Sequence, residues 1–239
     1  MTTKITRRAL LGAAGAGVVT LGSAEAAALA ASSEASGSRE PHYAMVFDQN
    51  KCVGCGDCKA ACNEANHLPP GISRLLMERQ SKSHRVIGKE PCPICGKLEE
   101  CERKYVRVSC QQCQDAPCVT VCPTGAAHHD PETGIVTMDP DRCVGCKYCI
   151  VACPYNARFI NAETKVADNC DFCLHTRFAE GRKPACVESC KYDALVFGNV
   201  NDPYSYISRL IRAKDTVRIR PELGTRPSLR YIPFVKKGA

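Results

Sequence analysis

The sequence has no tryptophan, and aromatic residues make up only 6% of its 239 residues. None of its basic stretches is interleaved with aromatic side chains, so the pattern typical of nucleic-acid-binding surfaces is missing. After residue 22 there is no apolar run of the ~20 residues that a membrane-spanning helix needs. The sequence also shows no nucleophile–base pair, phosphate-binding loop or set of substrate-binding carboxylates. We therefore expect no nucleic-acid partner, no membrane span in the mature chain and no catalytic residue.

Cysteine, in contrast, is abundant, and sixteen of the 19 cysteines fall into four groups of four. The groups are Cys52, Cys55, Cys58 and Cys62; Cys110, Cys113, Cys118 and Cys122; Cys143, Cys146, Cys149 and Cys153; and Cys170, Cys173, Cys186 and Cys190. Groups one and three have the C-x2-C-x2-C-x3-C spacing that binds [4Fe–4S] clusters in bacterial ferredoxins. Three thiolates on one tight loop reach three irons of one cluster, and the last cysteine turns toward a neighbouring cluster. Four groups predict four [4Fe–4S] clusters and a path for electrons.

Two other uses of so many cysteines are a disulfide framework and structural zinc. Disulfide frameworks are typical of secreted chains shorter than about 100 residues. Zinc sites use two separated C-x2-C pairs rather than three or four cysteines in one short loop. Groups two and four have looser spacings, so their assignment depends on their place in the series of four.

The N-terminus indicates export. Arg7 and Arg8 precede an apolar run that extends to about Leu21, which is short for a membrane span and typical of a signal peptide. Paired arginines at this position mark the twin-arginine route for folded proteins. We predict a signal peptide over residues 1–30 and a flexible leader over 31–41, the alternative being a frayed basic tail. Folded export suits thiols that must bind clusters before they meet an oxidising periplasm, so we predict a periplasmic protein, peripheral to the inner membrane.

The formal net charge of +7 must be corrected for the clusters. Once a signal peptide is removed, four clusters with thiolate ligands would turn the balance slightly negative. The basic side chains are then better explained as partners of buried cluster charge than as a nucleic-acid-binding patch.

Internal repetition predicts the architecture. The sequence K-C-V-G-C at residues 51–55 recurs as R-C-V-G-C at 142–146. Proline follows the last cysteine of groups two and three but not of groups one and four, which makes residues 103–169 an inner ferredoxin module. Residues 42–102 and 170–239, which end in a C-terminal helix and tail, would complete an outer module around it. The predicted fold class is α+β, with two nested bacterial 2[4Fe–4S] ferredoxin-like modules and a large loop content.

The nesting predicts which cysteines share a cluster. Each set takes three cysteines from one group and the last cysteine of its partner group: Cys52, Cys55 and Cys58 with Cys190; Cys170, Cys173 and Cys186 with Cys62; Cys110, Cys113 and Cys118 with Cys153; and Cys143, Cys146 and Cys149 with Cys122. The four clusters would form a roughly linear series, ordered outer, inner, inner, outer or in a closely related way.

With these motifs, the chain resembles the periplasmic four-cluster subunits of quinol-linked respiratory reductases, particularly the NrfC type. Further segments that carry the resemblance are Ala152–Tyr155, Ala157–Ile160, Ala185–Cys190, Asn201–Pro203 and Leu223–Pro227. The resemblance covers about residues 42–235. It implies an NrfD-like membrane subunit that oxidises quinol and a periplasmic terminal reductase, of the nitrite-reducing multihaem cytochrome type or of a sulfite, tetrathionate or polysulfide type.

The remaining cysteines lie in what looks like an insertion, at about residues 81–104. Cys92, Cys95 and Cys101 could bind zinc with His84 as a fourth ligand, form one disulfide with a spare thiol, or bind a fifth cluster.

Two functional classes follow. The first is an electron-transfer subunit without a substrate of its own. The second is an enzyme that reduces a small oxyanion or sulfur species at an incompletely ligated cluster. Four complete cysteine groups favour the first class, because an open iron needs a missing thiolate.

Overall fold

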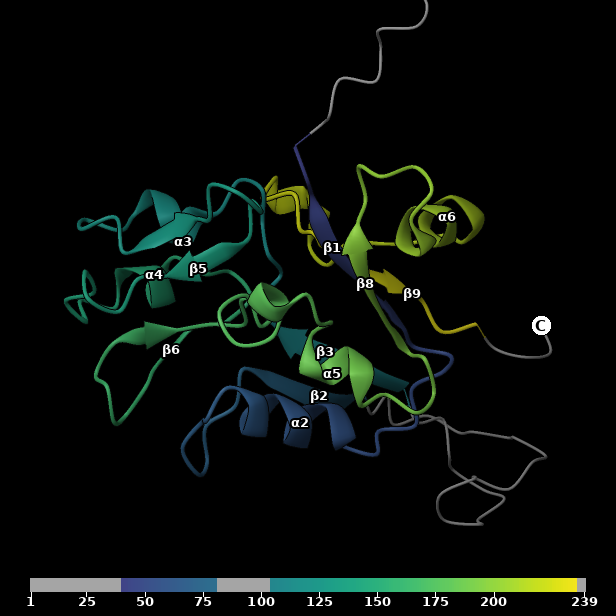
Figure 1. Ribbon diagram of the computed structural model, residues 1–239, viewed down its shortest axis with the longest axis horizontal. Helices are drawn as coiled ribbons and strands as arrows, with labels where there is room; N and C mark the ends of the chain where they lie inside the picture. Colours follow the sequence, from purple (N-terminus) through teal and green to yellow (C-terminus); the bar gives the residue numbers. More distant parts are fainter. Residues whose placement is uncertain (1–39, 81–103, 236–239) are drawn as a thin grey trace, which may run out of the picture. The chain divides into compact units, whose positions relative to one another are not determined.

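The central sheet joins distant parts of the sequence. The computed structural model describes residues 40–80 and 104–235. Strand β1 (Tyr43–Asp48) lies between β8 (Leu195–Asn199), which pairs with it antiparallel, and β9 (Leu229–Ile232), which pairs with it parallel (Figure 1). The apolar segment Ala44–Phe47 is buried on both faces of β1, which explains why this strand takes the middle position. The sheet therefore closes the part of the fold that carries cysteine groups one and four.

Helix α6 (Tyr206–Ala213) covers one face of this sheet, as the spacing of its apolar residues predicts. The Ser205 side chain accepts a hydrogen bond from the Ser208 backbone and so caps the first turn. Ile207 is buried with Ala44 and Val46 of β1. The helix is thus a support of the sheet, and it lies away from the cysteine groups.

Three antiparallel ladders make up the other strands. They pair β2 (Leu75–Gln80) with β3 (Lys104–Ser109), β4 (Ala127–His129) with β5 (Val136–Met138), and β6 (Phe159–Ile160) with β7 (Ala167–Asp168). In the turn before β5, the Asp130 carboxylate accepts hydrogen bonds from the backbone and hydroxyl of Thr133. Each ladder ends next to a cysteine-bearing loop.

The helices other than α2 and α6 are single turns. They are α3 (Pro117–Thr120), α4 (Tyr148–Val151), α5 (Ala185–Glu188) and the 3-10 turns η1 (Phe178–Glu180) and η2 (Pro221–Leu223), whereas α2 spans Asp57–Ala65. In Figure 1, α2 and α5 lie side by side, and they are in contact. The protein is a small mixed helix-and-strand fold with much irregular structure, in agreement with the α+β prediction.

Several predicted features lie outside the described residues. These are the signal peptide, the leader as far as residue 39, and the cysteines of the insertion, Cys92, Cys95 and Cys101. In residues 40–80 and 104–235, no helix is long and apolar enough to cross a membrane.

Candidate iron–sulfur sites

The two copies of the C-V-G-C repeat have the same backbone conformation. Gly54 has a φ of 72° and Gly145 a φ of 66°, which is the left-handed region that other residues rarely adopt. The Tyr105 ring packs directly on Gly54, and a side chain at Gly145 would meet the Lys165 carbonyl oxygen at 3.0 Å. Both glycines are therefore required for the loop to turn back and place its cysteines on one side.

Helix α2 presents two buried cysteines one turn apart. Cys58 and Cys62 are spaced by four residues, so they lie on the same face of the helix and both are buried. In the segment that contains α5, Cys186 and Cys190 have the same spacing. Because α2 packs against α5, these two pairs face a common region of the protein. Each helix can therefore supply one sulfur to each of two neighbouring sites.

One of these sites is a small cavity. Four cysteines line it, Cys52, Cys55 and Cys58 from group one and Cys190 from group four, which we call quartet A. The remaining walls are largely apolar and include Phe47, Met77 and Leu195. The structure thus brings together the four residues that the crossed-ligand pattern predicts for the first cluster.

The second site joins Cys62 to group four. Burial raises the pKa of Cys62 far above its usual value, and negative charge on Cys170, Cys186 and Cys173 raises it further. Cys62, Cys170, Cys173 and Cys186, called quartet B, are all nearly inaccessible to solvent. Phe172 and Cys173 both have left-handed backbone, and the Asp171 carboxylate accepts a hydrogen bond from the Cys173 backbone N–H at 3.0 Å.

Arg107 of β3 reaches quartet B from inside the protein. Its side chain is 0% exposed. One guanidinium nitrogen donates to Cys186 Sγ at 3.3 Å and the other to Cys170 Sγ at 3.7 Å, while Nε donates to the Ser109 hydroxyl. Burial would lower the pKa of Arg107, but the two sulfurs raise it above its usual range. Its charge is thus directed at the sulfurs.

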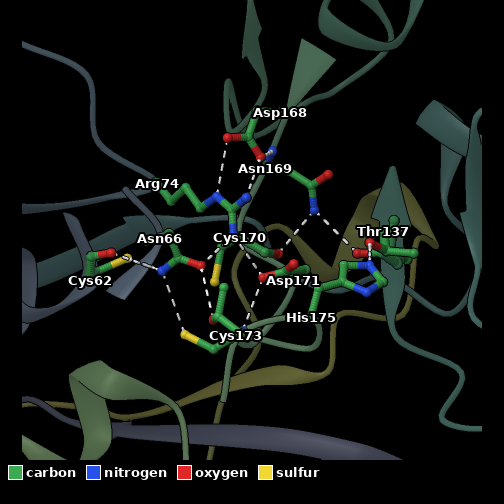
Figure 2. A network of polar contacts seen from close by, with 12 residues as sticks. Cys62, Asn66, Arg74, Thr137, Asp168, Asn169, Cys170, Asp171, Cys173 and His175 are labelled. Carbon is green, nitrogen blue, oxygen red and sulfur yellow. Dashed lines mark hydrogen bonds and ion pairs between the residues drawn. The ribbon is translucent and has the colours of Figure 1, made fainter. Parts of the chain in front are cut away.

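Asn66, at the end of α2, contacts the other two sulfurs of quartet B. Its amide nitrogen lies 3.7 Å from Cys62 Sγ and 3.6 Å from Cys173 Sγ (Figure 2). Its amide oxygen accepts a hydrogen bond from Arg74 at 2.8 Å, which fixes the orientation of the amide group. Arg74 in turn forms ion pairs with Asp168 and Asp171. The amide N–H groups of Asn66 are therefore held toward sulfur.

Cys153 of group three lies near group two. Charge on Cys118 and Cys153 raises the pKa of Cys113, which burial has already raised, to about 11. Cys153 also raises the pKa of the buried Cys118. Cys110, Cys113, Cys118 and Cys153 form quartet C. Cys149 is close to Cys143 of its own group and to Cys118 of quartet C.

Arg158 lies between groups two and three. It is 4% exposed, and the groups toward which its guanidinium is directed are the sulfurs of Cys118 and Cys149. Burial would lower its pKa, but charge on Cys118, Cys110 and Cys149 raises it. A buried guanidinium without a partner is costly unless negative charge lies beside it.

The two arginines fit iron–sulfur clusters at these sites. Burial raises the pKa of Cys58 to about 11 and of Cys170 to about 12, so metal-free thiols at these positions would be neutral at pH 7. Neutral thiols would leave Arg107 and Arg158 buried without counter-charge. Thiolates that bind iron are negative, and they supply the missing charge.

The spacing within the quartets differs from that of a site for a single ion. In the part of the chain that is described, no three His, Cys, Asp or Glu side chains come close enough to share one metal ion. Zinc needs all its ligands at about 2.0–2.3 Å from one centre. A cubane cluster has its irons at separate corners and takes ligands that are farther apart, as in quartets A to C.

Sequence reasoning anticipated basic partners for sulfur but not which residues these are. Arg107 had one available signal, as a charged residue between two valines in the strand before Cys110. Asn66 and Arg74 carry no local signal, because their roles depend on how α2 packs against group four. His175 lies two residues after Cys173, so the sequence allows a hydrogen bond from its ring to sulfur. In the structure, the His175 ring contacts the Thr137 hydroxyl at 2.9 Å instead.

Comparisons with known proteins agree with this chemistry. The family model of the 4Fe-4S dicluster domain matches residues 101–200. Protein NrfC of Escherichia coli K12 is 49% identical over 192 residues, which cover 80% of this chain and 81% of the relative. The B subunit of the polysulfide reductase of Wolinella succinogenes is 43% identical over 82% of this chain and 96% of the relative. The thiosulfate reductase electron transfer subunit PhsB of Salmonella typhi is 43% identical over 74% of this chain and 84% of the relative.

The fold, the buried cysteines and these relatives define the class. The protein is a ferredoxin-like iron–sulfur protein that binds [4Fe–4S] clusters and transfers electrons, and it is not itself a catalytic enzyme. More particularly, the chain belongs to the NrfC family.

The contact between Gly54 and Tyr105 leads to a testable prediction. Gly54→Ala should force the loop away from the ring and displace Cys52 and Cys55, since both the left-handed φ and the ring oppose a side chain. We expect the loss of one cluster, or about four irons per chain, in iron analysis of anaerobically purified protein. Gly71→Ala is the matched control, because Gly71 has a φ of 82° but no atom within 4 Å of an added Cβ. Equal iron content in the two variants would contradict the prediction.

Proposed function

We propose that this protein relays electrons from a quinol-oxidising, NrfD-like membrane subunit to a periplasmic terminal reductase, through four [4Fe–4S] clusters. Quartets A, B and C would bind three of them. Quartet D, made of Cys122, Cys143, Cys146 and Cys149, would bind the fourth. Each cluster would supply one-electron redox chemistry at its position. The observation that carries the proposal is the series of buried cysteine quartets, which crosses between groups as paired ferredoxin clusters do.

Quartet D is supported by the sequence pattern and by its local hydrogen bonds. The backbone N–H of Ala127 donates to Cys122 Sγ at 3.3 Å, and that of Ala167 donates to Cys143 Sγ at 3.4 Å. Partial burial acts to raise the pKa of Cys122, but hydrogen bonds from Ala127 and Thr124 outweigh it and lower this pKa. A lower pKa favours the thiolate, which is the form that binds iron.

The contacts between quartets favour a linear order A, B, C, D. Negative charge on Cys186 of quartet B raises the pKa of Cys58 in quartet A. Negative charge on Cys170 of quartet B raises the pKa of Cys110 in quartet C. Negative charge on Cys118 of quartet C likewise raises the pKa of Cys149 in quartet D. This order is outer, outer, inner, inner. It differs from the order that the nested repeats predict, because α2 and α5 bring the two outer quartets together.

The two ends of this series are also the accessible ones. Cys55 in quartet A and Cys146 in quartet D are the two exposed members of the four groups. Around Cys146, Val144 is 69% exposed and Val151 is 87% exposed, which leaves an apolar surface next to a terminal cluster. Clusters near the surface can exchange electrons with partner proteins, whereas those of quartets B and C would act inside the protein.

The relatives support the place of such a protein in a reductase complex. Two of them are named as parts of polysulfide and thiosulfate reductases, and one of these as an electron transfer subunit. Within the NrfC family, we favour a nitrite reductase of the multihaem cytochrome type as the acceptor, with sulfite, tetrathionate or polysulfide reductases as other candidates. Export by the twin-arginine route would place the protein in the periplasm.

No role is assigned to the insertion, where zinc or a disulfide at Cys92, Cys95 and Cys101 stays a hypothesis.

Reduction of a small substrate at an open cluster is the competing function. It would need a quartet that lacks one thiolate. All sixteen cysteines of the four groups can be assigned to complete quartets, which disfavours an open iron. We therefore place the chemistry of the substrate in the partner reductase.

Crossed ligation predicts the effect of two substitutions within group three. Cys153→Ser should remove the cluster of quartet C, and Cys146→Ser the cluster of quartet D, although both residues belong to one group. Unmodified protein should contain about sixteen irons and each variant about twelve. Paramagnetic resonance of the reduced variants should then show the loss of two different signals. Loss of the same signal in both variants would contradict crossed ligation.

The proposed twin-arginine route predicts where the precursor accumulates when the paired arginines are changed. Arg7→Lys together with Arg8→Lys should leave cluster-loaded precursor in the cytoplasm, because the folded-protein route reads this pair. Cell fractionation and the size of the product would measure the outcome. Normal accumulation of the double variant in the periplasm would refute the proposed route.

The relay itself can be tested with the membrane partner in vesicles. When quinol is supplied, we expect the paramagnetic signals of reduced clusters to appear only if the membrane subunit is present. The control is the same vesicle without that subunit. Absence of reduction in the complete system, together with turnover of a small oxyanion or sulfur compound by the isolated protein, would favour the competing function.

A further inference from the structure

Quartet B has an unusual set of hydrogen-bond donors. Arg107 donates to Cys186 and Cys170, and Asn66 donates to Cys62 and Cys173. Arg107 thus directs an N–H group at each of two sulfurs, and the Asn66 amide, which also donates to the Cys62 carbonyl oxygen at 2.8 Å, lies within reach of the other two. Figure 2 shows the Asn66 half of this arrangement, in which the amide lies between the two sulfurs.

The charge of Arg107 is not neutralised by a carboxylate. Among the described residues, its partners are the two sulfurs and the Ser109 hydroxyl. Arg74, the other cation near this quartet, is paired with Asp168 and Asp171, so its charge is largely compensated. Arg107 is also completely buried, and a charge shielded from water acts more strongly on its neighbours.

The other quartets have weaker donors within the described residues. In quartet A, the backbone N–H of Ala194 donates to Cys190 Sγ at 3.3 Å, and Cys55 is exposed to solvent. The charge of Arg158 is shared between sulfurs of quartets C and D. The charge of Arg107 also acts on Cys58 of quartet A, but its hydrogen bonds to sulfur are made to quartet B. Quartet B therefore combines the most complete burial with an arginine directed at two of its sulfurs.

We infer that the cluster of quartet B has the highest reduction potential of the four, and that Arg107 and Asn66 determine this potential. Reduction adds negative charge to a cluster, and a buried positive charge and N–H donors to sulfur stabilise the reduced form. The inference rests on the proposed function, because it requires four clusters held by the quartets. An electron that enters from quartet A would then settle on the second cluster of the series before it continues to quartets C and D.

The test is a redox titration of the cluster-loaded protein, followed by paramagnetic resonance. In Arg107→Gln and in Asn66→Asp, the transition of highest potential should shift to lower potential. Asn66→Asp keeps the size of the side chain and an oxygen for Arg74, but it replaces the N–H donors with a carboxylate charge, and both changes disfavour the reduced cluster. Arg107→Lys, which keeps the charge, should shift the transition less than Arg107→Gln. Arg212→Gln removes an exposed arginine of α6 and is the matched control, for which we expect no shift.

Full iron content with an unmoved highest transition in Arg107→Gln and Asn66→Asp would overturn the inference and leave the proposed function intact. A shift confined to a transition of lower potential would also overturn it. Fewer than four clusters in the unmodified protein would instead refute the proposed function. If Arg107→Gln does not retain the cluster of quartet B, Asn66→Asp, whose side chain is only partly buried, decides the question on its own.

Discussion

The burial of charged sulfur is the constraint on which the rest of this structure depends. The main hydrophobic core contains cysteines of both outer groups and of group two, next to Phe47, Phe172 and Leu229. As neutral thiols these residues would pack like small apolar side chains, but Arg107 and Arg158 would then be buried without counter-charge. As thiolates they would repel one another unless iron binds them. Cluster and arginine therefore require each other, and the core is complete only in the loaded protein.

The short helices also depend on the burial of cluster-binding sulfur. Helices α3, α4 and α5 have four residues each. A single helical turn is not stable on its own, because nucleation costs more than its few hydrogen bonds return. In this protein each of these turns carries a cysteine whose sulfur is buried, so a bound cluster would hold the turn in place. The longest helix, α2, is the exception among the cysteine-bearing helices, since its nine residues carry one cysteine for each of quartets A and B.

Cysteine spacing was sufficient to predict an iron–sulfur protein, because ligand geometry on a short loop is a local property. The meeting of Cys190 with group one was also predictable, since a terminal cysteine of a ferredoxin motif serves the neighbouring cluster. The partners of sulfur were not predictable in the same way. Arg107 acts on Cys170 and Cys186, which are more than sixty residues away, and it does so because β3 pairs with β2 beneath helix α2. Such a contact is a product of tertiary packing.

The paired geometry of α2 and α5 also bears on the direction of electron flow. The two segments exchange roles, since Cys58 and Cys190 belong to quartet A while Cys62 and Cys186 belong to quartet B. In the proposed relay, this reciprocity would place the clusters of quartets A and B next to each other. Exposed cysteines lie at both ends of the series, in quartets A and D. The proposed relay would therefore have no direction built into the arrangement of its ends, and the potentials of the partner proteins would determine which way electrons move.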